Sequence, residues 1–249
     1  NIHQHLDLIA GLPYEDYTSF ARSFDQVFAL EPDQLQLGFL KVLKGSPLYR
    51  EAGKFGIVWK DKPPYEVLYT RWLPYEDVLR LKGIEEMVEL YYNSNQFTHT
   101  LPVLETAFTD PFAMFEALAE FYRERGYFVN SPARVYRYQA LLDFACRYDG
   151  GREPLYRELL IYDMYLRENL KSRPDFARDP VPYKDRIREM LWKEGRQRNL
   201  THIEPFVYPV WDAERVKAGE KNREEVFVLF DYTVRSPLTH EAAVECKNG

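Results

Sequence analysis

The first fifty residues alternate between apolar and amphipathic segments. His5–Ala10 is rich in apolar side chains and ends at Gly11-Leu12-Pro13, which is typical of a buried strand followed by a turn. Residues 14–30 repeat their apolar side chains at helical spacing, so this segment predicts an amphipathic helix. Gln34–Phe39 then alternates polar and apolar residues with a period of two. The three segments together predict a parallel β-α-β unit with a right-handed crossover.

The rest of the chain reads as mostly helical. Two short strands are expected near residues 55–70, and two more near 203–232, where β-branched and aromatic residues accumulate. The later strands form a hairpin, or share one small sheet with the earlier pair. Helical periodicity and start signals predict helices over residues 74–92, 112–125, 132–148, 154–170 and 183–192. The expected fold class is therefore α+β, mostly helical, with a small antiparallel sheet.

The amino-acid composition of the chain limits the kinds of partner and the cellular location to be expected. The 249 residues are 45% hydrophobic and 16% aromatic, which is enough for a substantial core. A net charge of -6 argues against a nucleic-acid partner, since non-specific binding to phosphates needs a basic surface. No apolar run reaches the roughly 20 residues that span a bilayer, so no membrane partner is expected. The two cysteines are distant in sequence, which argues against a disulfide framework and favours a cytoplasmic location.

The motif Asp7-Leu8-Ile9-Ala10-Gly11-Leu12-Pro13 resembles the fifth strand of radical SAM enzymes, especially those like coproporphyrinogen dehydrogenase. In that family the strand reads Asp-Leu-Ile-x-Gly-Leu-Pro-Gly followed by Gln or Glu. Phe39–Leu48 resembles the sixth strand and its loop. The order of segments is similar to radical SAM proteins with a cobalamin-binding domain upstream and an uncharacterised domain downstream. The resemblance implies that residues 1–50 end a partial (β/α) barrel, and that residues 51–249 form a helical accessory domain.

The resemblance also implies a cofactor site. Ile9 and Gly11 would lie against the adenine of S-adenosylmethionine, and Leu40 and Lys41 would offer backbone contacts from the sixth strand. Such enzymes cleave S-adenosylmethionine at a 4Fe-4S cluster and abstract hydrogen from a substrate, which is unknown here. This chain departs from the family pattern at Tyr14, and Glu15 follows it.

The cluster itself requires three nearby cysteines, and Cys146 and Cys246 cannot form that binding loop. We therefore expect the chain to be the C-terminal fragment of a radical SAM protein, inactive by itself and holding no cofactor. The full-length protein would use S-adenosylmethionine and a 4Fe-4S cluster, and cobalamin is a further candidate cofactor. Truncation would leave a strand edge unpaired, so we expect a dimer formed through residues 1–45.

Two alternatives stay open. His3, His5 and Asp7 share one face of the first strand, where they could contact a substrate, bind a metal ion or simply pack. The whole chain could instead be a non-catalytic helical protein-interaction module, built from the aromatic-rich helices that follow Pro74. No catalytic residue can be assigned from the sequence, and no metal ligand is expected.

Overall fold

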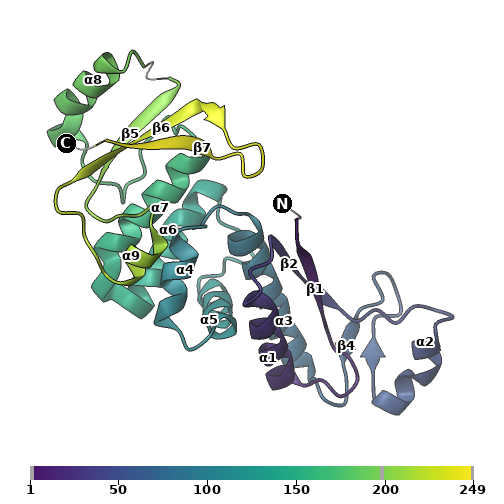
Figure 1. Cartoon of the computed structure of the whole chain (residues 1–249). Helices are drawn as coiled ribbons and strands as arrows, with labels where there is room; N and C mark the ends of the chain where they lie inside the picture. Colours follow the sequence, from purple (N-terminus) through teal and green to yellow (C-terminus); the bar gives the residue numbers. More distant parts are fainter. Residues whose placement is uncertain (1–2, 197–198, 248–249) are drawn as a thin grey trace. The chain divides into compact units, whose positions relative to one another are not determined.

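The computed structural model describes residues 3–196 and 199–247, and its secondary structure confirms the mostly helical α+β fold (Figure 1). The chain forms two compact units. The first contains Asn1–Ser94 and Phe108–Ser131, and the second contains Asn95–Ala107 and Pro132–Gly249. The first unit therefore includes residues on both sides of the boundary expected after residue 50. That boundary separates two expected family domains and stays a prediction.

The predicted β-α-β unit opens the first unit. It consists of β1 (His5–Ala10), α1 (Tyr17–Phe28) and β2 (Gln34–Phe39). The two strands are parallel, with His5 opposite Gln34 and Ala10 opposite Phe39. Helix α1 begins where the side chain of Asp16 accepts a hydrogen bond from the Ser19 amide at 2.8 Å, which satisfies an otherwise unpaired donor.

Aromatic packing holds α1 against α5 (Pro111–Glu124). Phe24 is fully buried, and its ring lies 5.5 Å from that of Phe112 and 5.8 Å from that of Phe115, both in edge-to-face geometry. Phe20 and Phe112 make a similar contact. The apolar stripe predicted for residues 14–30 is thus the contact surface between two helices that are distant in sequence.

A side chain covers the outer edge of β2. Helix α3 (Tyr75–Met87) continues into a π-helical turn, η2 (Val88–Asn93), which the sequence periodicity did not reveal. The amide of Asn93 accepts a hydrogen bond from the Leu35 N–H at 3.0 Å and donates one to the Leu35 carbonyl at 2.9 Å. Asn93 thereby imitates a neighbouring strand, and the other edge of the sheet, along β1, has no neighbouring strand among the described residues.

We expect the chain to self-associate through the β1 edge, because Asn93 occupies the β2 edge. Replacing Ile9 by lysine or proline should reduce the dimer, since both residues oppose pairing at a strand edge. Light scattering at several protein concentrations measures the effect. A wild-type protein that stays monomeric at every concentration would contradict this prediction. The predicted dimer uses residues 1–45, of which residues 1 and 2 lie outside the described part of the chain.

The segment after β2 forms a small antiparallel sheet. It contains α2 (Pro47–Glu51), η1 (Ala52–Phe55), β3 (Val58–Trp59) and β4 (Val67–Tyr69). Phe55, which was expected in a strand, instead ends a 3₁₀ turn, and Gly56 with φ +59° redirects the chain before β3 begins. An isolated bridge between Lys41 and Glu66 joins this hairpin to the end of β2.

The second unit combines helices with a three-stranded sheet. The predicted helices appear, with shifted ends, as α6 (Arg134–Asp149), α7 (Glu153–Arg167) and α8 (Lys184–Lys193). The short elements α4 (Thr100–Leu104), η3 (Glu105–Ala107), η4 (Gly150–Arg152), η5 (Val181–Tyr183) and α9 (Ala213–Lys217) join them. None of the described helices is both long enough and apolar enough to cross a membrane.

The sheet of the second unit has the order β5 (Thr201–Phe206), β6 (Val226–Arg235) and β7 (Ala242–Lys247), and all pairings are antiparallel. β5 and β6 form the predicted pair, in a sheet separate from the β3–β4 hairpin. β7 was missed because its exposed residues show no clean alternation. Both faces of the sheet carry apolar packing: Leu191 of α8 contacts one face, and Tyr162 of α7 contacts Phe206 and Phe230 on the other.

Candidate functional site

The carboxyl ends of β1 and β2 carry the residues that the sequence singled out. Ile9 is the last residue on the exposed face of β1, and 47% of its surface is accessible to solvent. Gly11, which follows the strand, is buried. Leu40 and Lys41 follow β2 directly. Ligands of parallel α/β folds bind at this end of the strands, so these four residues border one candidate site.

The backbone groups of Leu40 and Lys41 differ in availability. The Leu40 N–H donates to the Ala10 carbonyl at 2.9 Å, and its carbonyl accepts from the Val67 N–H at 2.8 Å. The peptide groups of Lys41, by contrast, form no hydrogen bond within the described part of the chain. Lys41 is therefore the better placed of the two to offer backbone contacts to a ligand.

Gly11 is required by both conformation and space. Its φ of +89° lies in the left-handed region, which residues with a Cβ disfavour. A Cβ at this position would also lie 2.8 Å from Cγ1 of Val67. The glycine thus allows the end of β1 to pass directly over β4.

We expect Gly11→Ala to lower the free energy of unfolding by about 2–4 kcal/mol, from the backbone conformation and the overlap with Val67 together. Gly45→Ala is the matched control, because Gly45 has φ +84° but a Cβ added there would meet nothing within 4 Å beyond its chain neighbours. The control should cost only about 1–2 kcal/mol. Urea unfolding of both variants checks this, and equal losses would show that space around Gly11 is unimportant.

Tyr14 and Glu15 shape the loop after β1. Tyr14 occupies the glycine position of the strand motif and adopts φ +71°, a conformation typical of glycine. Its ring lies 4.6 Å from that of Trp72 and 6.0 Å from that of Phe55. Burial, and then the charge of Asp16, raise the pKa of the Glu15 carboxyl. One Glu15 oxygen, Oε2, is buried and has no hydrogen-bond partner among the described residues.

The exposed face of the β1–β2 sheet carries a polar set. The Nε2 atom of His5 lies 3.0 Å from Oδ1 of Asp7 and 3.2 Å from Oε1 of Gln36. Both neighbouring oxygens are hydrogen-bond acceptors, so Nε2 is the donor in these contacts. His3 does not join this set, because its Nδ1 lies 3.7 Å from Asp33. The sequence motif does not single out Gln36, yet its register opposite Asp7 places it there.

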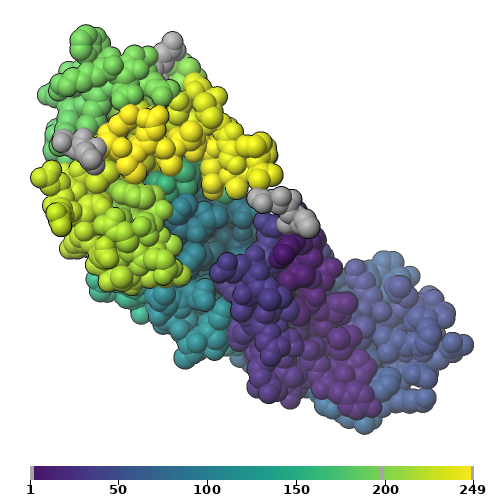
Figure 2. Space-filling model, viewed as in Figure 1, coloured from purple at the N-terminus to yellow at the C-terminus, as the bar shows by residue number. Residues whose placement is uncertain are grey.

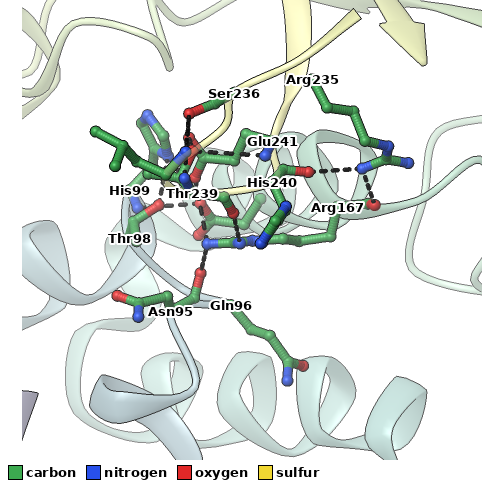
Figure 3. A network of polar contacts seen from close by, with 12 residues as sticks. Asn95, Gln96, Thr98, His99, Arg167, Arg235, Ser236, Thr239, His240 and Glu241 are labelled. Atoms are coloured by element: carbon green, nitrogen blue, oxygen red, sulfur yellow. Dashed lines mark hydrogen bonds and ion pairs between the residues drawn. The ribbon is translucent and has the colours of Figure 1, made fainter. Parts of the chain in front are cut away.

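The second unit contains a polar network around Arg167 (Figure 3). The Arg167 guanidinium donates to the Asn95 carbonyl, to the Thr239 carbonyl at 2.6 Å and to the Glu241 carboxylate at 3.3 Å. Arg235 donates to the carbonyls of Arg167 at 3.0 Å and His240 at 2.7 Å. These bonds hold the β6–β7 turn against the end of α7, which is a structural role.

Asp163 of α7 organises the start of α4. Its carboxylate is 1% exposed and accepts four hydrogen bonds: from the His99 N–H at 3.0 Å, His99 Nδ1 at 2.8 Å, the Thr100 N–H at 3.0 Å and the Thr100 hydroxyl at 2.7 Å. Burial lowers the pKa of His99, but the hydrogen bond and charge of Asp163 outweigh burial and raise it. No local pattern pointed to this pair, because its members are distant in the chain.

Two further buried carboxylates lie at β5: Glu204 belongs to the strand, and Glu158 of α7 bonds to the residues directly after it. Glu204 is 3% exposed and contacts both terminal nitrogens of Arg173 and, at 3.0 Å, Nε2 of His202. Burial raises the pKa of Glu204, but the bonds from His202 and Arg173 outweigh it and lower the pKa overall. Glu158 accepts the Tyr208 N–H at 2.9 Å, and burial raises its pKa. Each carboxylate is satisfied within the fold.

Among the described residues, no three His, Cys, Asp or Glu side chains converge as metal ligands. Cys146 lies on α6 and Cys246 on β7. Burial raises the pKa of both thiols, so neither is activated as a thiolate.

No curated protein matches the sequence significantly. A protein-family profile does match residues 53–230, which is more than half of the chain, and its description is "Protein of unknown function (DUF4080)". The matched region starts near the expected boundary after residue 50 and includes all helices from α3 to α9. The chain therefore belongs to the DUF4080 family.

Proposed function

We propose that β1, α1 and β2 are the end of a radical SAM barrel, and that the carboxyl ends of β1 and β2 hold part of S-adenosylmethionine. The observation that carries this proposal is the strand-end geometry: the motif that resembles the family forms a parallel pair, and it ends at a glycine with φ +89°. The exposed side chain of Ile9 and the unengaged peptide groups of Lys41 support it.

The residues fit a bound nucleoside in two respects. Ile9 offers an apolar surface for a ring, and Lys41 offers one backbone donor and one acceptor. His5 and Asp7, on the same strand, would orient a substrate.

When bound, the 4Fe-4S cluster would supply the electron that cleaves S-adenosylmethionine, and the 5′-deoxyadenosyl radical would abstract hydrogen from the substrate. The cluster ligands of this proposal lie outside the 249 residues, as would a cobalamin domain. Under this proposal the chain contributes binding groups, and we expect it to bind S-adenosylmethionine weakly or not at all in isolation.

The deciding experiment uses the full-length protein, reduced anaerobically with S-adenosylmethionine. An iron–sulfur signal by electron paramagnetic resonance and formation of 5′-deoxyadenosine are the expected results. Lys41→Ala should leave the KM for S-adenosylmethionine unchanged, since it keeps the backbone groups, whereas Lys41→Pro should raise it by removing the N–H. Absence of both the signal and 5′-deoxyadenosine would refute the proposal.

The alternative, a non-catalytic interaction module, is favoured by one observation. The family match lies on residues 53–230 and leaves out β1 and β2, which carry the radical SAM resemblance. The two functions differ in what the gene encodes before residue 1. An upstream Cys-x3-Cys-x2-Cys run supports the enzyme, and its absence supports the interaction module.

A further inference from the structure

The charge of the chain is unevenly distributed. Residues 41–62 contain six Lys and Arg against two Asp and Glu, a net charge of +4, so the other residues together carry -10 to give the total of -6. A negative net charge disfavours non-specific binding to phosphates. A local cationic surface can still bind them where no acidic side chains neutralise its charges. The arrangement of these lysines in space therefore decides whether the segment can act as a binding surface.

The fold brings two of these lysines to either side of one residue. Lys41 is bridged to Glu66, and the Lys60 N–H donates to the Glu66 carbonyl at 2.9 Å, so Lys41 and Lys60 flank the same residue. The Glu66 carboxylate is occupied by Lys82 at 3.0 Å. We call Lys41, Lys44, Lys60 and Lys62 the lysine surface; all four are exposed and form no ion pair with any described residue.

An aromatic groove adjoins the lysine surface. The rings of Tyr49 and Trp59 lie 5.6 Å apart at 69°, and a groove of about 350 Å³ is lined by both rings together with Lys44 and Asp61. A groove of this volume is large enough for one heterocyclic base. The segment that forms it is the blue part of the surface in Figure 2.

We propose that the lysine surface and this groove together bind a single-stranded polynucleotide, with phosphates on the lysines and one base against Trp59. Lysines spread over two neighbouring segments of the chain match phosphates spaced along a backbone, whereas a mononucleotide presents its phosphates at one point. Stacking on an aromatic ring requires an unpaired base, which favours a single strand over a duplex. The binding does not depend on the radical chemistry proposed above.

The test measures fluorescence anisotropy of labelled oligouridine and oligothymidine on the whole chain. We expect a dissociation constant of about 1–100 μM at 50 mM salt. Four lysine contacts should give a slope of about -3 for the logarithm of the association constant against the logarithm of the salt concentration. Comparing the affinities for oligouridine and oligothymidine shows whether the chain prefers single-stranded RNA or single-stranded DNA. Lys41→Gln/Lys60→Gln should weaken binding about tenfold and bring the slope to about -1.5.

Lys171→Gln/Lys184→Gln is the matched control, because both lysines are exposed, form no ion pair with a described residue and lie outside the lysine surface. It should change affinity less than about twofold. Trp59→Leu should weaken binding about tenfold without changing the slope, since stacking is not ionic. Circular dichroism confirms that each variant is folded. No saturable binding, equal losses in the control pair, or preference for polyglutamate over both oligonucleotides would overturn the proposal.

Discussion

Asp163→Ala is expected to lower the free energy of unfolding of the second unit by about 3–5 kcal/mol. The carboxylate is 1% exposed, and its loss leaves donors of His99 and Thr100 without partners at the start of α4. Asp163→Asn keeps the volume but can accept with only one oxygen, so it should cost about half as much. Urea unfolding followed by circular dichroism measures both.

Asp185→Ala is the control for Asp163, because its side chain is 94% exposed and, within residues 3–196 and 199–247, pairs only with Arg188 on the same helix. Such a surface pair is worth at most about 0.5 kcal/mol. If Asp163→Ala were no more harmful than the control, the four hydrogen bonds of Asp163 would contribute little to stability.

The same pair predicts a pH dependence. Because the pKa of folded His99 is raised, its protonated form stabilises the fold fully below the unfolded pKa of about 6.5. This contribution is lost as pH rises through the folded pKa. The difference in unfolding free energy between wild type and His99→Gln should therefore shrink as pH is raised from about 6 towards about 9. A difference that is constant with pH would contradict the assignment.

Arg173→Met is expected to destabilise the second unit by a comparable amount, about 3–5 kcal/mol, because it removes the guanidinium that pairs with the buried Glu204 carboxylate. Replacing both members of the ion pair leaves no unpaired charge buried. The double variant Arg173→Met/Glu204→Gln should therefore be more stable than Arg173→Met alone. Denaturant unfolding of the wild type, both single variants and the double variant measures the coupling free energy.

Lys54→Met provides the exposed comparison, since Lys54 and Glu51 form an ion pair at 3.3 Å with both side chains largely in solvent. It should change stability by less than about 0.5 kcal/mol. Because the pKa of folded Glu204 is lowered, its ionised form stabilises the fold fully above the unfolded pKa of about 4.5. This stabilisation is lost as pH falls through the folded pKa. A double variant as unstable as Arg173→Met would show that the cost of that variant comes from lost packing.

Local patterns in the sequence determined most of the elements. The β-α-β unit and helix α5 were predictable, because strand alternation, helical spacing and the Asp110-Pro111 start signal act between near neighbours. Asp110 does accept the Ala113 N–H at 2.7 Å, as an N-cap should. The glycine motif at Gly11 was also readable, and its φ of +89° gives the physical reason for glycine.

Tertiary structure alone decided the rest. The π-helical turn at Val88–Asn93 exists where Asn93 reaches Leu35, a contact that no local pattern encodes. Asp163 and Glu204 read as ordinary charged residues until helices and strands from elsewhere in the chain bury and pair them. Lys41 and Lys60 become neighbours only through pairing with the segment of Glu66. Spacing along a chain fixes which residues share a face, but burial and charge pairing depend on what the other elements bring to that face.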